Sequence, residues 1–239
     1  MSQYPDVTAH SDIQTLFENV FFVQGSVMIA PNFQISRNMI IVREGHDLTL
    51  ISSVRLSEEG LKALDKLGQV KHVIRLGAYH LGAQNGLDDA FYLDRYQAKY
   101  WLMEGMTSAS DSAAHKVLKD NSELPFTGAI FISYPSSNMP EGLILLERNN
   151  GILISADSFQ NWLADDYFSD NALVMMQKMG FIRPANIGPE WLRHCEPDKV
   201  DFDRILTQKF RHLIPSHGVP ILQTAKQELQ QTVSELFRE

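Results

Sequence analysis

Two short apolar runs in this sequence each end at a side chain that can bind a metal ion. Residues 151–157 read Gly-Ile-Leu-Ile-Ser-Ala-Asp and end at Asp157, and residues 213–218 carry His217 directly before a glycine. Aliphatic runs of this length are typical of buried strands. A carboxylate and a neutral imidazole are both good ligands for zinc or iron. The two residues therefore predict a metal site, provided that the fold brings the two strand ends together.

The elements that must position these residues can be read from the hydrophobic pattern. Strands are predicted at 19–30, 38–43 and 47–54 as an antiparallel meander, followed by a helix at 57–68 that Ser57 caps and Gly68 ends. Further strands are predicted at 70–76, 99–102, 128–134, 142–147 and 151–156, and helices at 91–98, 159–168, 171–179, 202–213 and 220–237. Two sheets with helices outside account for this order better than a simple βαβ winding. A doubly wound nucleotide fold would also need a glycine-rich phosphate loop after the first strand, which this chain does not have.

Composition and charge narrow the possible partners. The chain has 239 residues, a formal net charge of −8 and no run of Lys or Arg, so nucleic acid and anionic membrane surfaces are not expected partners. The single cysteine, Cys195, excludes an intrachain disulfide and fits a reducing compartment, where we expect it to be a packed thiol. The N-terminus lacks the features of a signal peptide, and no apolar run approaches the roughly 20 residues of a membrane span. These features predict a cytoplasmic protein.

Four segments give the chain a resemblance to the metallo-β-lactamase fold superfamily. They are residues 47–53, 61–74, 152–157 and 215–218, and the resemblance extends from about Val20 to Val233. It implies an α+β fold, a four-layer αββα sandwich in which two mixed sheets pack face to face with helices outside. It also implies one domain over residues 1–239, with an N-terminal half at about 15–125 and a C-terminal half at about 126–239. Metal-binding loops would line one edge.

The sequence departs from the family pattern where most metal ligands should lie. The family motif H-x-H-x-D-H should follow Val73-Ile74, but residues 75–89 contain only His80, with Asp88 and Asp89 further on. Asn138 occupies the place of another family histidine, and serines at 52 and 53 replace an acidic turn. The ligand set that the resemblance implies is thus His80, Asp157 and His217. Asp88 or Asp89 would be catalytic and would orient or deprotonate a metal-bound water.

This ligand count limits the cofactor to one metal. Catalytic zinc typically has three protein ligands and one open position, and mixed nitrogen and oxygen donors also suit iron or manganese. The expectation is therefore one divalent metal (zinc, iron or manganese), or none. A two-metal site would need about twice as many ligands as the sequence offers.

Each of these residues also has a purely structural interpretation. His80 could be a solvated loop histidine, and His217 could belong to a turn that enters a helix. Asp157 could cap the helix predicted to begin near residue 159. Asp88 and Asp89 could be favourable acids at a helix N-terminus, with the aromatic rings that follow them packing inward.

Two functions of different classes remain open on the sequence. The first is a single-metal hydrolase of an ester, amide or phosphate bond. The alternative is a non-catalytic member of the fold that binds a small molecule or a partner protein, which the missing histidines favour. An unrelated αβ scaffold is a third possibility, and it predicts that Asp157 and His217 lie far apart. The expected partner is a small-molecule substrate or ligand, while the substrate and the oligomeric state are not fixed by the sequence.

Overall fold

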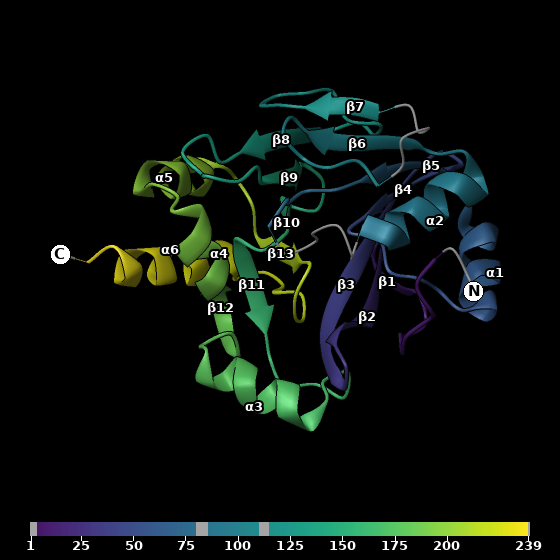
Figure 1. The fold of residues 1–239 in the computed structure, drawn as a ribbon. Helices are drawn as coiled ribbons and strands as arrows, with labels where there is room; N and C mark the ends of the chain where they lie inside the picture. Colours follow the sequence, from purple (N-terminus) through teal and green to yellow (C-terminus); the bar gives the residue numbers. More distant parts are fainter. Residues whose placement is uncertain (1–3, 80–85, 110–114, 239) are drawn as a thin grey trace.

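The computed structural model describes residues 4–79, 86–109 and 115–238. Within these residues the N-terminal part of the chain forms a seven-stranded sheet in which strands follow one another in sequence order (Figure 1). Its strands are β1 (Gln14–Phe17), β2 (Val20–Ala30), β3 (Phe33–Glu44), β4 (Asp47–Ile51), β5 (Gln69–Ile74), β6 (Lys99–Met103) and β7 (His115–Leu118). The strands β1 to β4 pair antiparallel, which confirms the predicted meander, and β4 to β7 pair parallel. Parallel neighbours need crossovers, and α1 (Glu58–Leu67) and α2 (Gly86–Tyr96) lie in two of them.

The C-terminal part contributes a second sheet with the strand order β13-β10-β9-β8. Its members are β8 (Ala129–Ser133), β9 (Gly142–Leu146), β10 (Ile152–Ser155) and β13 (His212–Pro215). β10 pairs parallel with β13 and antiparallel with β9. Every residue of β9, β10 and β13 is buried, which explains why these strands read as continuous apolar runs.

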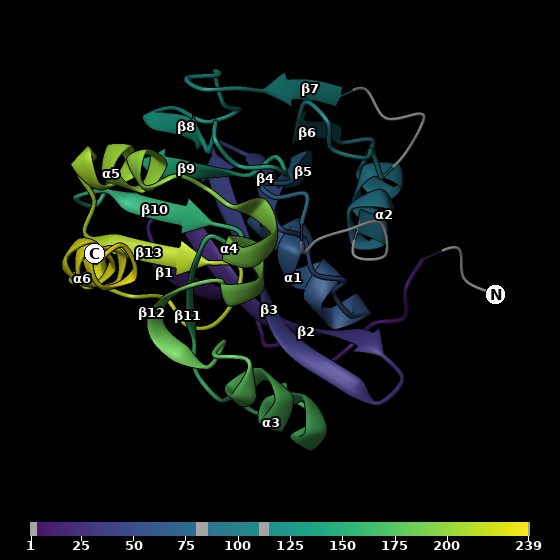
Figure 2. The same ribbon diagram turned by 60° about the vertical axis from the view of Figure 1, so that its left-hand side comes forward.

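The two sheets pack face to face, with helices on both outer faces (Figure 2). One buried cluster joins the sheets, with Ile40 of β3 on one side and Ile154 and Ile214 of the second sheet on the other. A second cluster lies under α1 and α2. A third lies under α4 (Pro189–Cys195), α5 (Lys199–Thr207) and α6 (Ala225–Leu236). The predicted α+β fold, a four-layer αββα sandwich, is confirmed.

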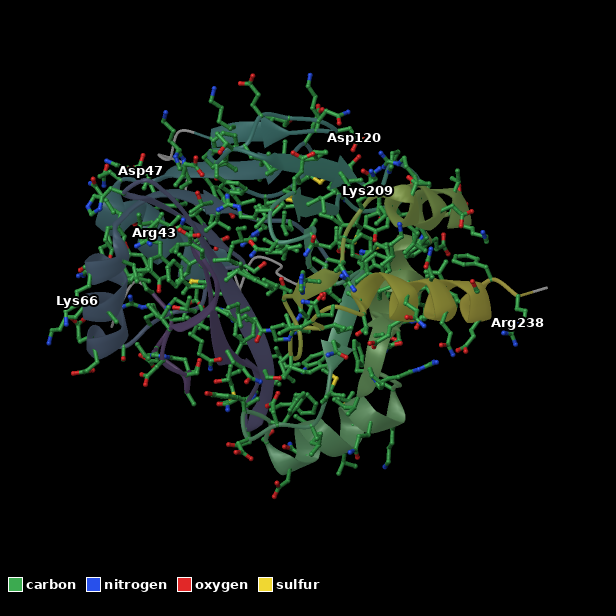
Figure 3. The ribbon with its side chains drawn as sticks, turned by 180° about the vertical axis from the view of Figure 1, so that it is seen from behind. Arg43, Asp47, Lys66, Asp120, Lys209 and Arg238 are labelled. Atoms are coloured by element: carbon green, nitrogen blue, oxygen red, sulfur yellow. The ribbon has the colours of Figure 1, made fainter. Side chains whose placement is uncertain are left out.

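The outer helices expose their polar faces. Seen from behind, Lys66 on α1 and Arg238 after α6 point away from the molecule at opposite ends (Figure 3). The predicted cap of α1 is also confirmed, because the Ser57 side chain accepts a hydrogen bond of 3.1 Å from the Gly60 amide. None of the helices in the described part of the chain combines the length and apolar character that crossing a bilayer requires.

Two helix predictions were wrong. Residues 159–168 do not form a helix, because β11 (Phe159–Trp162) pairs with β12 (Arg183–Ile187) as a small separate sheet. Asp157 is therefore not a helix cap. The helix predicted at 202–213 ends at Thr207 as α5, and the chain then enters β13. In both segments pairing with a distant strand overrides the local helical pattern.

The small sheet is joined to the first sheet at one end of the molecule. α3 (Asp170–Lys178) connects β11 to β12 and lies beside the turn between β2 and β3 (Figure 1). Gln34 at the start of β3 donates from its side chain to the Tyr167 carbonyl oxygen at 2.9 Å and from its backbone to Ser169 Oγ at 3.1 Å.

Candidate functional site

The fold brings Asp157 and His217 together. β10 and β13 are parallel neighbours with Ser155 opposite Pro215, and each candidate lies two residues beyond its strand end. Equal offsets from a matched pair place both side chains at the same sheet edge. His217 Nε2 lies 3.4 Å from Asp157 Oδ1, and both residues are at most 2% exposed. An unrelated scaffold with distant strand ends is thereby excluded.

Contacts from the first sheet and from β11 fix the orientation of the His217 ring. Its Nδ1 lies 3.1 Å from the Ser36 carbonyl oxygen, and because a carbonyl only accepts, Nδ1 carries the hydrogen. The Trp162 ring stacks on the imidazole with centroids 4.4 Å apart, and Trp162 Nε1 donates to Ser36 Oγ at 2.7 Å. These contacts turn Nε2 toward Asp157. The imidazole ring of His217 therefore has a fixed orientation, with Trp162 against one face and Nε2 directed at the carboxylate of Asp157.

The turn after His217 is held by backbone contacts. Gly218 has a φ of +87°, and a Cβ at this position would lie 2.5 Å from the Trp162 Cα atom and closer still to the Asn161 carbonyl oxygen. Asn38 of β3 donates from its side-chain amide to the carbonyl oxygens of Pro215 at 2.8 Å and Gly218 at 2.6 Å. The segment that carries His217 after β13 therefore packs between β3 and β11.

Glu141 is a buried acid at this site that was not predicted from the sequence. It is 0% exposed, and its Oε1 accepts a hydrogen bond of 2.6 Å from the Ser158 amide. Burial is the main reason that the pKa of Glu141 is raised well above its usual range, and the nearby charge of Asp157 raises this pKa further. No local signal marks this residue, since Pro140-Glu141-Gly142 reads as an ordinary turn. Its position follows from the antiparallel pairing of β9 with β10, which places the start of β9 beside the end of β10, and Glu141 also forms an isolated bridge with Gly77.

Asp88 and Asp89 lie in a different place, in the first turn of α2. Asp88 forms a buried ion pair with Arg37 Nη2 and accepts from the Arg55 amide at 3.1 Å. Asp89 accepts from Arg75 Nε at 3.2 Å, and also from Tyr100 and Ser53 hydroxyl groups.

The strand β3 separates the two aspartates from the Asp157–His217 pair. The Ser36 side chain accepts a hydrogen bond from Trp162, whose ring stacks on His217, whereas the side chain of the next residue, Arg37, contacts Asp88. Consecutive strand residues point to opposite faces of a sheet, so Asp88 lies on the helix-covered face and His217 on the other. The catalytic role of Asp88 and Asp89 stays a prediction, and their ion pairs with arginine do not favour it.

The other predicted positions are less informative. His80 lies outside the described residues. Asn138 donates from its side chain to Glu196 Oε2 at 3.0 Å, near the end of α4. Ser52 Oγ lies 2.8 Å from Ser216 Oγ and so joins the end of β4 to the strand end before His217. Cys195 is fully buried, and burial raises the pKa of its thiol to about 11, as expected for a packed thiol.

Several solved structures share this architecture. A metallo-β-lactamase from Hirschia baltica matches with a TM-score of 0.58 and 14% identity, over 93% of this chain and 97% of that one. The metal-soaked flavodiiron core from Synechocystis matches with a TM-score of 0.68 and 14% identity, over 96% and 62% of the two chains. For the flavodiiron protein from Giardia intestinalis the TM-score is 0.65 and the identity 18%, over 95% and 59%. The chain has the metallo-β-lactamase fold. No family model matches the sequence, and neither does any curated protein.

A metallo-β-lactamase fold raises the question of whether the residues present suit a metal ion. Among residues 4–79, 86–109 and 115–238, no three His, Cys, Asp or Glu side chains come together in a group that could hold one. A catalytic zinc needs three protein ligands, and Asp157 with His217 supplies two. The described donor set therefore does not fit a metal centre.

A cavity of about 240 Å³ opens beside Asp157 in this metallo-β-lactamase fold. Its wall combines aromatic rings and flexible thioethers, contributed by Phe33, Tyr79, Phe181, Trp191, Met175, Met176 and Met179. Gln160 of β11 also lines it and is 1% exposed. Mostly apolar walls with a few polar groups are typical of small-molecule sites, and this volume lies just below the usual range for drug-sized ligands, about 300 to 1,000 Å³.

Proposed function

We propose that this chain is a non-catalytic member of the metallo-β-lactamase fold that binds a small organic molecule in the cavity beside Asp157. The observation that carries the proposal is the side-chain amide of Gln160. Neither its Oε1 nor its Nε2 has a hydrogen-bond partner among the described residues, although the residue is buried against the cavity. An unpaired buried amide costs about 1 to 3 kcal/mol, and a bound ligand would remove this cost.

The wall of the cavity supports the same proposal. Thioether side chains are flexible and polarisable, so Met175, Met176 and Met179 can adapt to a ligand. Trp191 Nε1 is a second buried donor without a partner among the described residues, and it belongs to the same wall. The cavity thus combines apolar walls with the indole donor of Trp191 and the amide of Gln160. Such a combination is typical of sites that bind small molecules.

Binding of a neutral fluorescent probe tests this proposal. N-phenyl-1-naphthylamine should bind saturably at one site, with a rise in its fluorescence. Ile29→Trp should weaken binding by about tenfold or more, because Ile29 lines the cavity and its exposed position can hold a larger side chain that blocks the opening. Met28→Trp is the matched control, since Met28 is similarly exposed but is not part of this wall. Equal binding of the dye to both variants would contradict the proposal, and so would the absence of saturable binding by both the dye and smaller organic molecules.

A metal-dependent hydrolase is a second candidate, and the contact between Asp157 and His217 favours it. On this proposal His80 would be the third ligand, and the metal would be zinc, iron or manganese. Protein purified without chelator should then hold about one equivalent of metal, which His217→Ala should lose and the exposed-site control His46→Ala should keep. Less than about a tenth of an equivalent, with no uptake on addition, would refute this second function and leave the first in place.

A further inference from the structure

The charged groups in the cavity wall are acidic. Among its described lining residues are Asp157 and Glu190, and none is Lys or Arg. Glu190 accepts hydrogen bonds from Arg193 Nε at 3.2 Å and Nη2 at 2.5 Å and lies 3.5 Å from His194 Nε2, but Arg193 is 63% exposed and neither residue lines the cavity. A carboxylate or phosphate ligand would meet acid oxygens there without a facing cation. The wall therefore disfavours anions and accepts neutral or positively charged molecules.

The aromatic rings add a preference for positive charge. Phe33 begins β3, Tyr79 follows β5, Phe181 precedes β12 and Trp191 lies on α4, yet all four line the same cavity. A cation is attracted to the face of an aromatic ring within about 6 Å, most strongly when it is removed from water. The cavity wall thus combines aromatic rings from four separate segments with two acids. This combination is typical of a site that binds an ammonium group.

We infer that the ligand of this cavity is a small organic cation, a quaternary or protonated amine that also carries a hydroxyl group. This inference rests on the proposed function and names its ligand class. The ammonium group would lie between the aromatic rings and the acids. The hydroxyl would donate to Gln160 Oε1 and accept from Trp191 Nε1, two buried atoms without partners among the described residues.

Competition between two molecules of equal shape tests the charge preference. Choline and 3,3-dimethyl-1-butanol differ in that a quaternary nitrogen replaces a carbon. Choline should displace N-phenyl-1-naphthylamine at a concentration about tenfold lower than the alcohol does, because the rings and acids act on its charge. The anion 3,3-dimethylbutanoate should not displace the dye. Direct calorimetric titration with choline provides a readout that does not depend on the dye.

Two conservative variants test whether the preference for a cation comes from the residues of the cavity wall. Phe33→Leu should weaken choline binding about fivefold and leave alcohol binding within about twofold, because it removes a ring face and keeps an apolar side chain. Glu190→Gln should also reduce the ratio between the two affinities. Folding of each variant is checked by its unfolding transition, and Phe33 is only half-buried.

The outcomes separate this inference from the proposed function. If the dye binds but choline and the alcohol displace it equally, the cation inference is wrong and the binding function stands. If the dye does not bind and choline gives no heat of binding, both are wrong. If choline binds by calorimetry without the dye, the inference holds and the dye is simply too large for the cavity.

Discussion

Asp88→Ala is expected to lower the free energy of unfolding by about 3 to 5 kcal/mol, as measured by denaturant titration. The carboxylate of Asp88 is paired with Arg37, which is 2% exposed in the folded protein. Burial already lowers the pKa of Arg37 to about 10, which reflects the cost of keeping this charge away from water. Removal of this side chain would leave a buried guanidinium without the carboxylate that contacts it. This cost is far larger than that of losing a surface ion pair.

Two controls make this prediction specific. The pair between Lys199 and Asp203 is about half exposed on both sides, so Asp203→Ala should change the free energy of unfolding by less than about 1 kcal/mol. The double variant Arg37→Met with Asp88→Leu removes both charges and should recover most of the lost stability, because apolar pairs often replace buried ion pairs well. A loss below about 1 kcal/mol for Asp88→Ala would mean that the ion pair is not structural, and the predicted catalytic role would regain support.

Gly218→Ala is the second change with a large expected effect, a loss of about 3 to 5 kcal/mol from backbone strain and steric overlap together. The φ of +87° disfavours any residue with a Cβ, and the new Cβ would overlap backbone atoms of Asn161 and Trp162. Because backbone cannot rotate away as a side chain can, β11 or the turn after His217 must shift. We therefore also expect the stacking of Trp162 on His217 to change, which tryptophan fluorescence can follow.

Gly180→Ala is the matched control for this effect. Gly180 has a similar φ of +79°, but a Cβ there meets nothing within 4 Å. Gly180→Ala should lower the free energy of unfolding by only the cost of the positive φ, about 1 to 2 kcal/mol, without a change in tryptophan fluorescence. Equal losses for the two variants would indicate that φ alone matters, and that close contact between β11 and the turn after His217 does not hold the site.

The sequence by itself determined the buried strands that end near Asp157 and His217, together with the residues at their ends. Buried strands need continuous apolar runs, so the segments that end near Asp157 and His217 were visible without a structure. The cap of α1 at Ser57 was also visible, because a side-chain hydrogen bond to the next turn is local. These features depend on neighbours in sequence, which a single chain displays directly.

Only the tertiary structure decided which of these residues meet. Residues 159–162 form a strand because β12 pairs with them, and no local pattern encodes a partner more than 20 residues away. Glu141 lies near Asp157 because β9 and β10 pair antiparallel, which places the start of β9 beside the end of β10. Asp88 contacts Arg37 on one face of β3, while His217 lies on the other, where the ring of Trp162 stacks on it and donates to Ser36 Oγ. The chemistry of each side chain follows from its residue type. Which side chains come together in a site depends on long-range strand pairing, and that pairing is set by the packing of the two sheets.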